Sequence, residues 1–252
     1  MAQLATVDEV WGVLDNHDFG LDAETLLRYS AECLQHALAF FEHLNPGNAT
    51  VRRTVEAVRQ SLDGNRPTLG VLEMLDADLR GHPPVSDWPS KDFIFATGEL
   101  AWSFVSLVNH GPELVAPSKE MTYYLAHTSS VARYCAAAME GAQRLKEQAW
   151  QLGEFYKFFP NFANHSEDEF LDAIVEELDA RLPNDWVVPN RPRGSNSDCE
   201  ENGDDDEPPY SHFCAKTFRV GMPKDAIRAR GDTAVGAMLA LELEASRRFP
   251  VA

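Results

Sequence analysis

The chain has 252 residues, enough for one large domain or for one domain with an appendage. Its residues are 44% hydrophobic and 25% charged, a composition that can bury a sizeable core and excludes global disorder. Acidic residues number 40 against 22 basic ones, for a net charge of −18 with neutral histidine. Such a charge argues against a general nucleic-acid binder and against electrostatic docking on an anionic membrane. We therefore expect a soluble, acidic, globular protein.

The sequence also lacks the usual signals of export. Residues 1–12 have neither the basic start nor the long apolar core of a secretory signal. The most apolar stretch, Phe93 to Val108, is too short and too polar to span a bilayer and is better interpreted as a buried helix. The four cysteines, Cys33, Cys135, Cys199 and Cys214, lie far apart. We expect a cytoplasmic protein without a disulfide framework.

Apolar residues recur with helical spacing almost throughout the chain, which predicts an all-α fold. The pattern favours a multi-helix bundle of about eight helices with a long acidic loop. The predicted helices cover residues 6–20, 22–44, 48–62, 68–80, 91–109, 118 to beyond 150, 166–182 and 232–249. Thr6 and Glu9 have the spacing of a capping box, as do Ser166 and Glu169, and Asp232 is the predicted cap of the last helix.

Two of these helices carry a prediction about burial. The helix over 91–109 is apolar on nearly every side, which is typical of a central element. The helix over 68–80 is expected to turn one row of leucines inward: Leu69, Leu72, Leu75 and Leu79.

Residues 183–214 interrupt the helical pattern. They hold five prolines, several Gly, Ser and Asn, and seven acids between Asp198 and Glu207, so we expect a loop or linker. Residues 215–220 could form a short strand beside 186–188, a minor two-stranded element near the C-terminus. The predicted organisation is a helical bundle over 1–182, the acidic segment over 183–214, and a C-terminal helix within 215–252 that packs back on the bundle.

The negative charge is concentrated in one part of the chain. Residues 161–210 hold 15 acids and three arginines, whereas the last 42 residues hold four acids and seven bases. In the helix over 166–182, carboxylates recur at steps of three, four and three and therefore share one face. Three interpretations remain open: a solvated acidic face, a docking surface for a cationic partner, and a metal site.

The partner-binding candidates are the acids of that helix and of the following segment. They are Glu169, Asp172, Glu176, Asp179, Asp198, Glu200, Glu201, Asp204, Asp205, Asp206 and Glu207. The run from Asp204 to Glu207 is not an EF-hand loop, because the later ligand spacing and the bidentate Glu are missing.

Signatures of catalysis, metal binding and cofactor binding are sparse. The sequence contains no dinucleotide-binding, phosphate-loop, serine-hydrolase or zinc-protease motif. Cys199, His212 and Cys214 suggest zinc, but their spacing is cramped and the usual paired knuckle is absent. Glu32 and His36 lie one turn apart and are interpreted as polar residues at the core edge. We predict no catalytic residue, no metal site and no cofactor.

Glu99 is the most interesting lone titratable residue, because it lies within the apolar helix over 91–109. Buried there, it would need a partner or have a raised pKa. We expect a structural pairing with an arginine such as Arg133. The alternative is a pocket near Glu99 and His127 that serves an enzyme or a ligand-binding bundle.

Three segments carry a family resemblance. The stretch from Leu27 to Glu42 (LRYSAECLQHALAFFE) resembles the opening helix of the putative bacterial immunity proteins of polymorphic toxin systems. The segment 52–64 (RRTVEAVRQSLDG) is similar to the next helix of that family. Its matching positions are Arg52, Val55, Glu56, Ala57, Arg59 and Gly64. The segment 127–138 (HTSSVARYCAAA) is similar to the last, alanine-rich helix, whereas residues 150–252 have no counterpart in the family.

The resemblance implies an all-α cytoplasmic protein that binds and neutralises a bacterial toxin. A carboxylate surface can occupy the basic active-site groove of a toxin nuclease in place of phosphate, so the expected partner is a basic protein. The alternatives are another protein-interaction or regulatory role, and a helical-bundle enzyme.

Overall fold

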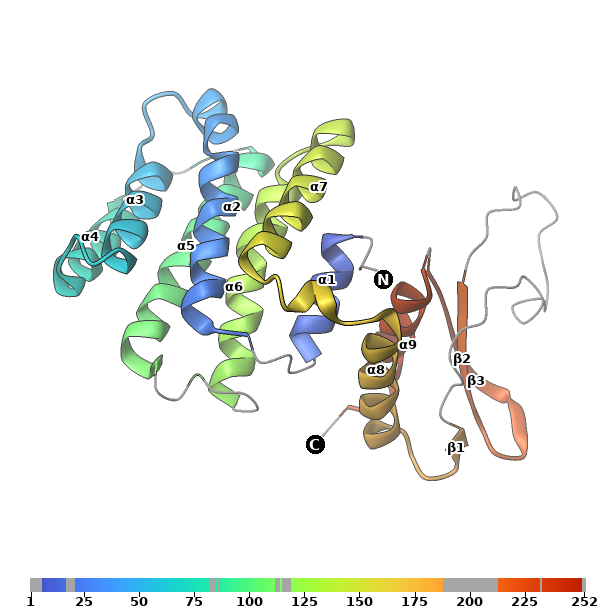
Figure 1. The fold of residues 1–252 in the computed structure, drawn as a ribbon. Coiled ribbons are helices and arrows are strands. Elements are labelled where there is room, and N and C mark those ends of the chain that lie inside the picture. The colour runs from blue at the N-terminus through green and yellow to red at the C-terminus, as the bar shows by residue number, and fades with distance from the viewer. Residues whose placement is uncertain are drawn as a thin grey trace. The chain divides into compact units, whose positions relative to one another are not determined.

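A computed structural model describes residues 6–16, 21–81, 85, 87–111, 114, 119–187, 213–231 and 233–250 (Figure 1). These residues form nine α-helices and a small three-stranded antiparallel sheet, which confirms the predicted, mainly all-α fold class. The chain divides into two compact units, Leu14–Phe162 and Met1–Val13 together with Ala163–Ala252. This division differs from the boundaries at 182 and 214 that the composition suggested.

The unit over 14–162 is purely helical. Its helices are α2 (Ala23–Leu44), α3 (Thr50–Leu62), α4 (Thr68–Gly81), α5 (Trp88–His110), α6 (Lys119–Ala137) and α7 (Gly141–Phe158). α2 is its central element and packs against α3, α5, α6 and α7 (Figure 1). The face predicted for α2 is buried, including Tyr29, Cys33 and Phe41.

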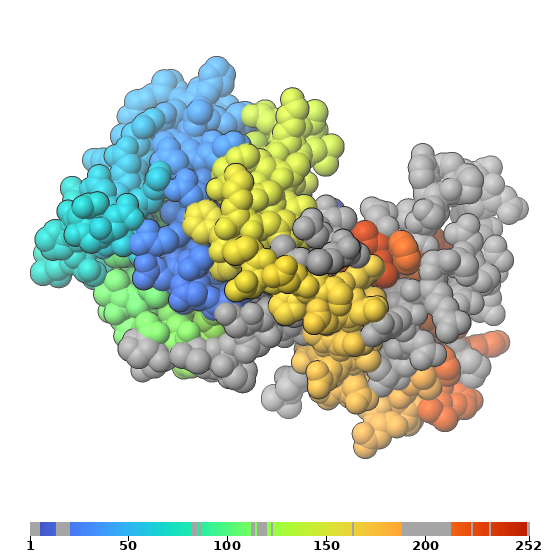
Figure 2. Space-filling view, viewed as in Figure 1, coloured from blue at the N-terminus to red at the C-terminus, as the bar shows by residue number. Residues whose placement is uncertain are grey.

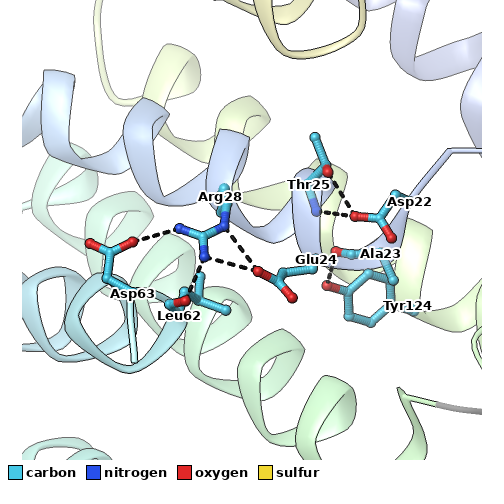
Figure 3. Close-up of polar contacts among 8 residues, drawn as sticks. All are labelled: Asp22, Ala23, Glu24, Thr25, Arg28, Leu62, Asp63 and Tyr124. Atoms are coloured by element: carbon cyan, nitrogen blue, oxygen red, sulfur yellow. Dashed lines mark hydrogen bonds and ion pairs between the residues drawn. The ribbon is translucent and has the colours of Figure 1, made fainter. Parts of the chain in front are cut away.

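The start of α2 shows how polar side chains hold this unit together (Figure 3). Asp22 caps the helix by accepting a hydrogen bond of 2.8 Å from the Thr25 amide. Arg28 pairs with Glu24 on its own helix and, at 2.8 Å, with Asp63 at the end of α3. The Tyr124 hydroxyl of α6 donates to the Ala23 carbonyl at 2.6 Å. The first turn of α2 is therefore tied to both α3 and α6.

Two expectations about the helices of this unit are wrong in detail. The helix predicted from 118 to beyond 150 is two helices, α6 and α7, separated at residues 138–140. Gly141 begins α7 with φ +52°, a left-handed conformation that glycine adopts without a steric penalty. In α4, Val71 and Leu75 are buried, whereas Leu69 and Leu79 of the predicted inner row are exposed.

The apolar helix α5 is buried on one side only. Phe93, Leu100 and Phe104 lie in the core, but Phe95 and Trp102 are 51% and 41% exposed. Its uniform apolarity therefore does not mark a helix surrounded by the core, because a row of aromatic side chains remains on the surface.

The second unit combines three helices with the sheet. Its elements are α1 (Val7–Asn16, of which residues 7–13 belong here), α8 (Glu167–Arg181), β1 (Trp186–Val187), β2 (Phe213–Arg219), β3 (Met222–Gly231) and α9 (Ala234–Arg248). A short 3-10 helix, η2 (Phe162–Asn164), lies at the junction. The strands are ordered β1-β2-β3, α9 packs on β2 and β3, and α8 packs on α9.

The predicted two-stranded element is confirmed but incomplete. β2 pairs with β1, as expected, and also with β3, which the sequence did not predict. β3 contains one large β-branched residue, Ile227, beside exposed Arg228 and Arg230, and it includes Pro223; a single such residue is a weak signal for a strand. Its buried side chains are Ile227 and Ala229, and the strand packs against α9.

The capping boxes at Thr6–Glu9 and Ser166–Glu169 are confirmed. Thr233, rather than Asp232, is the N-cap of α9, and its hydroxyl accepts from the Gly236 amide at 2.9 Å. The same hydroxyl donates to the Glu9 carboxylate. Glu9 therefore joins the starts of α1 and α9.

The cysteines differ in state. Cys33 and Cys135 are buried free thiols, whose pKa values are raised by burial. Cys214 is disulfide-bonded, and its partner lies outside the described residues. The expectation of a chain without disulfides is therefore wrong for Cys214.

Candidate functional site

The carboxylates predicted as a partner-binding column lie along α8. Glu169, Asp172, Glu176 and Asp179 are all exposed, and together we call them the acidic α8 face. The opposite side of the helix is buried through Phe170, Leu171, Ile174 and Leu178. The space-filling view shows α8 at the surface, in gold (Figure 2). The remaining predicted acids, Asp198, Glu200, Glu201, Asp204, Asp205, Asp206 and Glu207, lie outside the described residues.

Within this face, Glu169 also forms part of the N-terminal cap of α8. Its carboxylate accepts a 2.6 Å hydrogen bond from the Ser166 amide, while its own amide donates to the Ser166 hydroxyl. The hydrogen bonds that the Ser166 amide and the Ser166 hydroxyl donate to this carboxylate, with a smaller contribution from nearby His165, lower the pKa of Glu169. Glu169 is therefore ionised at neutral pH and held in place, and Asp172, Glu176 and Asp179 continue the column away from the cap.

Glu99 is paired, but not with the residue expected. Nδ1 of His127 on α6 is hydrogen-bonded to Oε2 of Glu99 on α5. The His127 ring also packs against Trp102, one turn further along α5, with centroids 3.8 Å apart and the ring planes tilted by 33°. The partner of Glu99 is therefore His127 and not the predicted Arg133. The structure thus brings together the two residues of the candidate pocket.

A second constellation of the same kind lies between α2 and α7. Nδ1 of His36 is 2.8 Å from Oε2 of Glu147, and the His36 ring stacks on Trp150 with centroids 3.7 Å apart. The pairing of His36 with Glu147 differs from the interpretation of His36 as a polar residue at the core edge. The available signal was a repeated Glu-x-Ala-Trp, at 99–102 and at 147–150, which places a carboxylate and an indole on one face of a helix.

The two constellations differ in solvent access. The Glu147 side chain is 3% exposed, and its Oε1 accepts from Gln151 at 3.1 Å. The Glu99 side chain is 25% exposed. Glu147 therefore belongs to the buried framework, whereas Glu99 and its neighbours can reach a ligand from solvent.

A groove of about 690 Å³ lies elsewhere in the helical unit. It is lined by Leu44, Asn45, Pro46, Gly47, Asn48, Ala49, Thr50, Arg53, Gly81, Val85 and Asp87. Neither Glu99 nor His127 lines it. The described part of the chain contains no group of three or more His, Cys, Asp or Glu residues that could hold a metal ion. Within that same part, no helix is long and apolar enough to cross a bilayer.

The positions that carry the family resemblance make structural contacts. Arg52 binds Glu42 of α2 through two hydrogen bonds of 2.7 Å. Arg59 pairs with Glu32 of α2 at 3.0 Å, and Gly64 follows α3 with φ +72°. These residues join α3 to α2 rather than forming a site. No protein-family model, curated protein or solved structure matches this chain.

Proposed function

We propose that this chain is an immunity-type binding protein that neutralises a basic protein toxin by presenting the acidic α8 face to it. The observation that carries the proposal is the exposure of all four carboxylates along one side of α8. From Glu169 to Asp179 the column extends about 15 Å, at 1.5 Å per residue. A line of fixed negative charge of this length suits a basic groove that otherwise binds a phosphate backbone.

The resemblance of residues 27–64 and 127–138 to putative immunity proteins supports the same class of function. The proposal places action in the cytoplasm, with no nucleic acid or membrane as a direct partner. The disulfide of Cys214 does not favour that compartment, because disulfides persist mainly in oxidising environments.

The proposal is tested by sequencing the genes that flank this one and by co-expressing the chain with a toxin domain found among them. The chain should restore growth, and the triple variant Asp172→Asn, Glu176→Gln, Asp179→Asn should bind the toxin more slowly, with a weaker salt dependence. This variant retains Glu169 and so leaves the helix cap intact. Growth that is not restored by the wild-type chain would refute the immunity role.

A matched variant controls for net charge. Glu73→Gln, Glu120→Gln and Glu140→Gln remove three exposed carboxylates from the helical unit. If these substitutions slow association as much as those on α8, general charge rather than the acidic α8 face would attract the partner. The assignment to α8 would then be wrong.

A second candidate, a helical-bundle enzyme, is favoured by one observation: Glu99 orients His127 as a carboxylate orients a general base. Turnover of a substrate by the purified chain, abolished in a folded Glu99→Gln variant, would favour this candidate over the immunity role.

A further inference from the structure

A row of aromatic side chains lies exposed along the seam between α5 and α6. Phe95 packs against Tyr134 with ring centroids 5.6 Å apart, and Trp102 packs against His127 at 3.8 Å. Gly98 and Glu99 lie between the two ring pairs. We call this set the aromatic notch: Phe95, Gly98, Glu99 and Trp102 of α5 with His127 and Tyr134 of α6. The ring pairs are about 10 Å apart along α5, seven residues at 1.5 Å each.

Gly98 leaves the middle of the notch open. A Cβ at this position would have no heavy atom within 4 Å, so packing within the chain does not require glycine there. A helix with glycine at an interior position is less stable than the same helix with alanine there, by about 1 kcal/mol. Without a side chain at this position, the backbone of α5 is accessible to a ligand at the middle of the notch.

The chemistry of the notch suits a cation. Indole, phenol and phenyl faces carry negative quadrupole potential and attract ammonium and guanidinium groups. Glu99 supplies a formal negative charge at the centre, and only its Oε2 is engaged by His127. Partial exposure of Glu99 and Trp102 makes both accessible to a side chain from solvent.

We infer that the aromatic notch binds an arginine side chain of a basic protein partner. The planar guanidinium stacks on the exposed aromatic faces and donates a hydrogen bond to Glu99. This inference rests on the proposed function for the source of the arginine, but it concerns a different unit from the acidic α8 face. The two surfaces can therefore be tested separately.

The probe is an acetylated, amidated decapeptide of alternating glycine and arginine, titrated calorimetrically into the full chain at 150 mM salt. Trp102→Leu and Glu99→Gln should each weaken binding about five- to tenfold. Gly98→Ala should weaken it about threefold or more by filling the notch, while leaving the helical circular dichroism unchanged. Glu73→Gln removes the same charge from α4 and should leave binding within about twofold of wild type.

The same peptide with citrulline in place of arginine keeps the planar shape without the charge. It should not bind measurably, and equal binding of the two peptides would overturn the inference. The inference would also be overturned if folded Trp102→Leu and Glu99→Gln variants bound the arginine peptide with unchanged affinity. If those variants bind the arginine peptide normally while the α8 variant still loses toxin binding, the notch assignment fails and the proposed function stands. If the wild-type chain does not bind the toxin but the notch variants lose the arginine peptide, the proposed function fails and the notch assignment stands.

Discussion

His36→Ala should destabilise the protein far more than a substitution at an exposed core edge normally does. The hydrogen bond to Glu147 contributes about 1.5–3 kcal/mol when one partner is ionised. The stack on Trp150 contributes about 0.5–1.5 kcal/mol beyond area burial. The Glu147 side chain is only 3% exposed, so in the variant its carboxylate would keep Gln151 as a donor and water would replace the lost imidazole less completely than at an exposed carboxylate. We expect the free energy of unfolding to fall by about 2–4 kcal/mol.

The second constellation is an internal control. In His127→Ala, water can replace the imidazole at Glu99, which is 25% exposed. The loss of stability should therefore be about 1–2 kcal/mol, mostly from the ring contact with Trp102. His36→Phe retains an aromatic ring against Trp150 and should isolate the loss of the hydrogen bond.

Urea unfolding followed by far-ultraviolet circular dichroism measures each variant against wild type. His36→Ala should cost about 1 kcal/mol or more less in a Glu147→Gln background than in the wild-type protein, because that background has no carboxylate for His36 to bind. Equal losses in His36→Ala and His127→Ala, within about 0.5 kcal/mol, would refute the argument from burial.

Three further predictions concern backbone and caps. Gly231→Ala should lower stability by about 3 kcal/mol in thermal unfolding, because a Cβ there would lie 2.3 Å from a backbone nitrogen of α9; Gly70→Ala, which meets open space, should not. Gly98→Ala should raise stability by about 0.5–1 kcal/mol in urea unfolding, and a loss would contradict the open notch. Asp87→Ala should cost about 1 kcal/mol at pH 7, because it removes the cap of α5. Hydrogen bonds from Ser90 lower the pKa of Asp87 below 3.8, so the stabilisation is complete above this value and is lost as the pH falls through the lowered pKa. A difference between Asp87→Ala and wild type that persists at pH 2 would contradict this assignment.

Local sequence signals predicted the local structure well. The capping boxes at Thr6 and Ser166 and the glycine after α3 were correctly predicted, because each depends on residues within a few positions of one another. The exposure of the acidic α8 face followed from the apolar residues on its other side. Where the sequence was misleading, as for α4 and α5, apolar residues are exposed because none of the described elements covers that side.

The sequence by itself determined the mainly helical class, the approximate position of most helices and the face of α8 that carries charge, but it did not show the break between α6 and α7. The tertiary structure alone decided which histidine meets which carboxylate, since Glu99 and His127 are 28 positions apart and His36 and Glu147 are 111 apart. It also decided that β3 is a strand and that Phe95 and Trp102 remain accessible. Helix periodicity and caps are short-range properties of the chain, whereas pairing and exposure depend on which surfaces distant segments bring together.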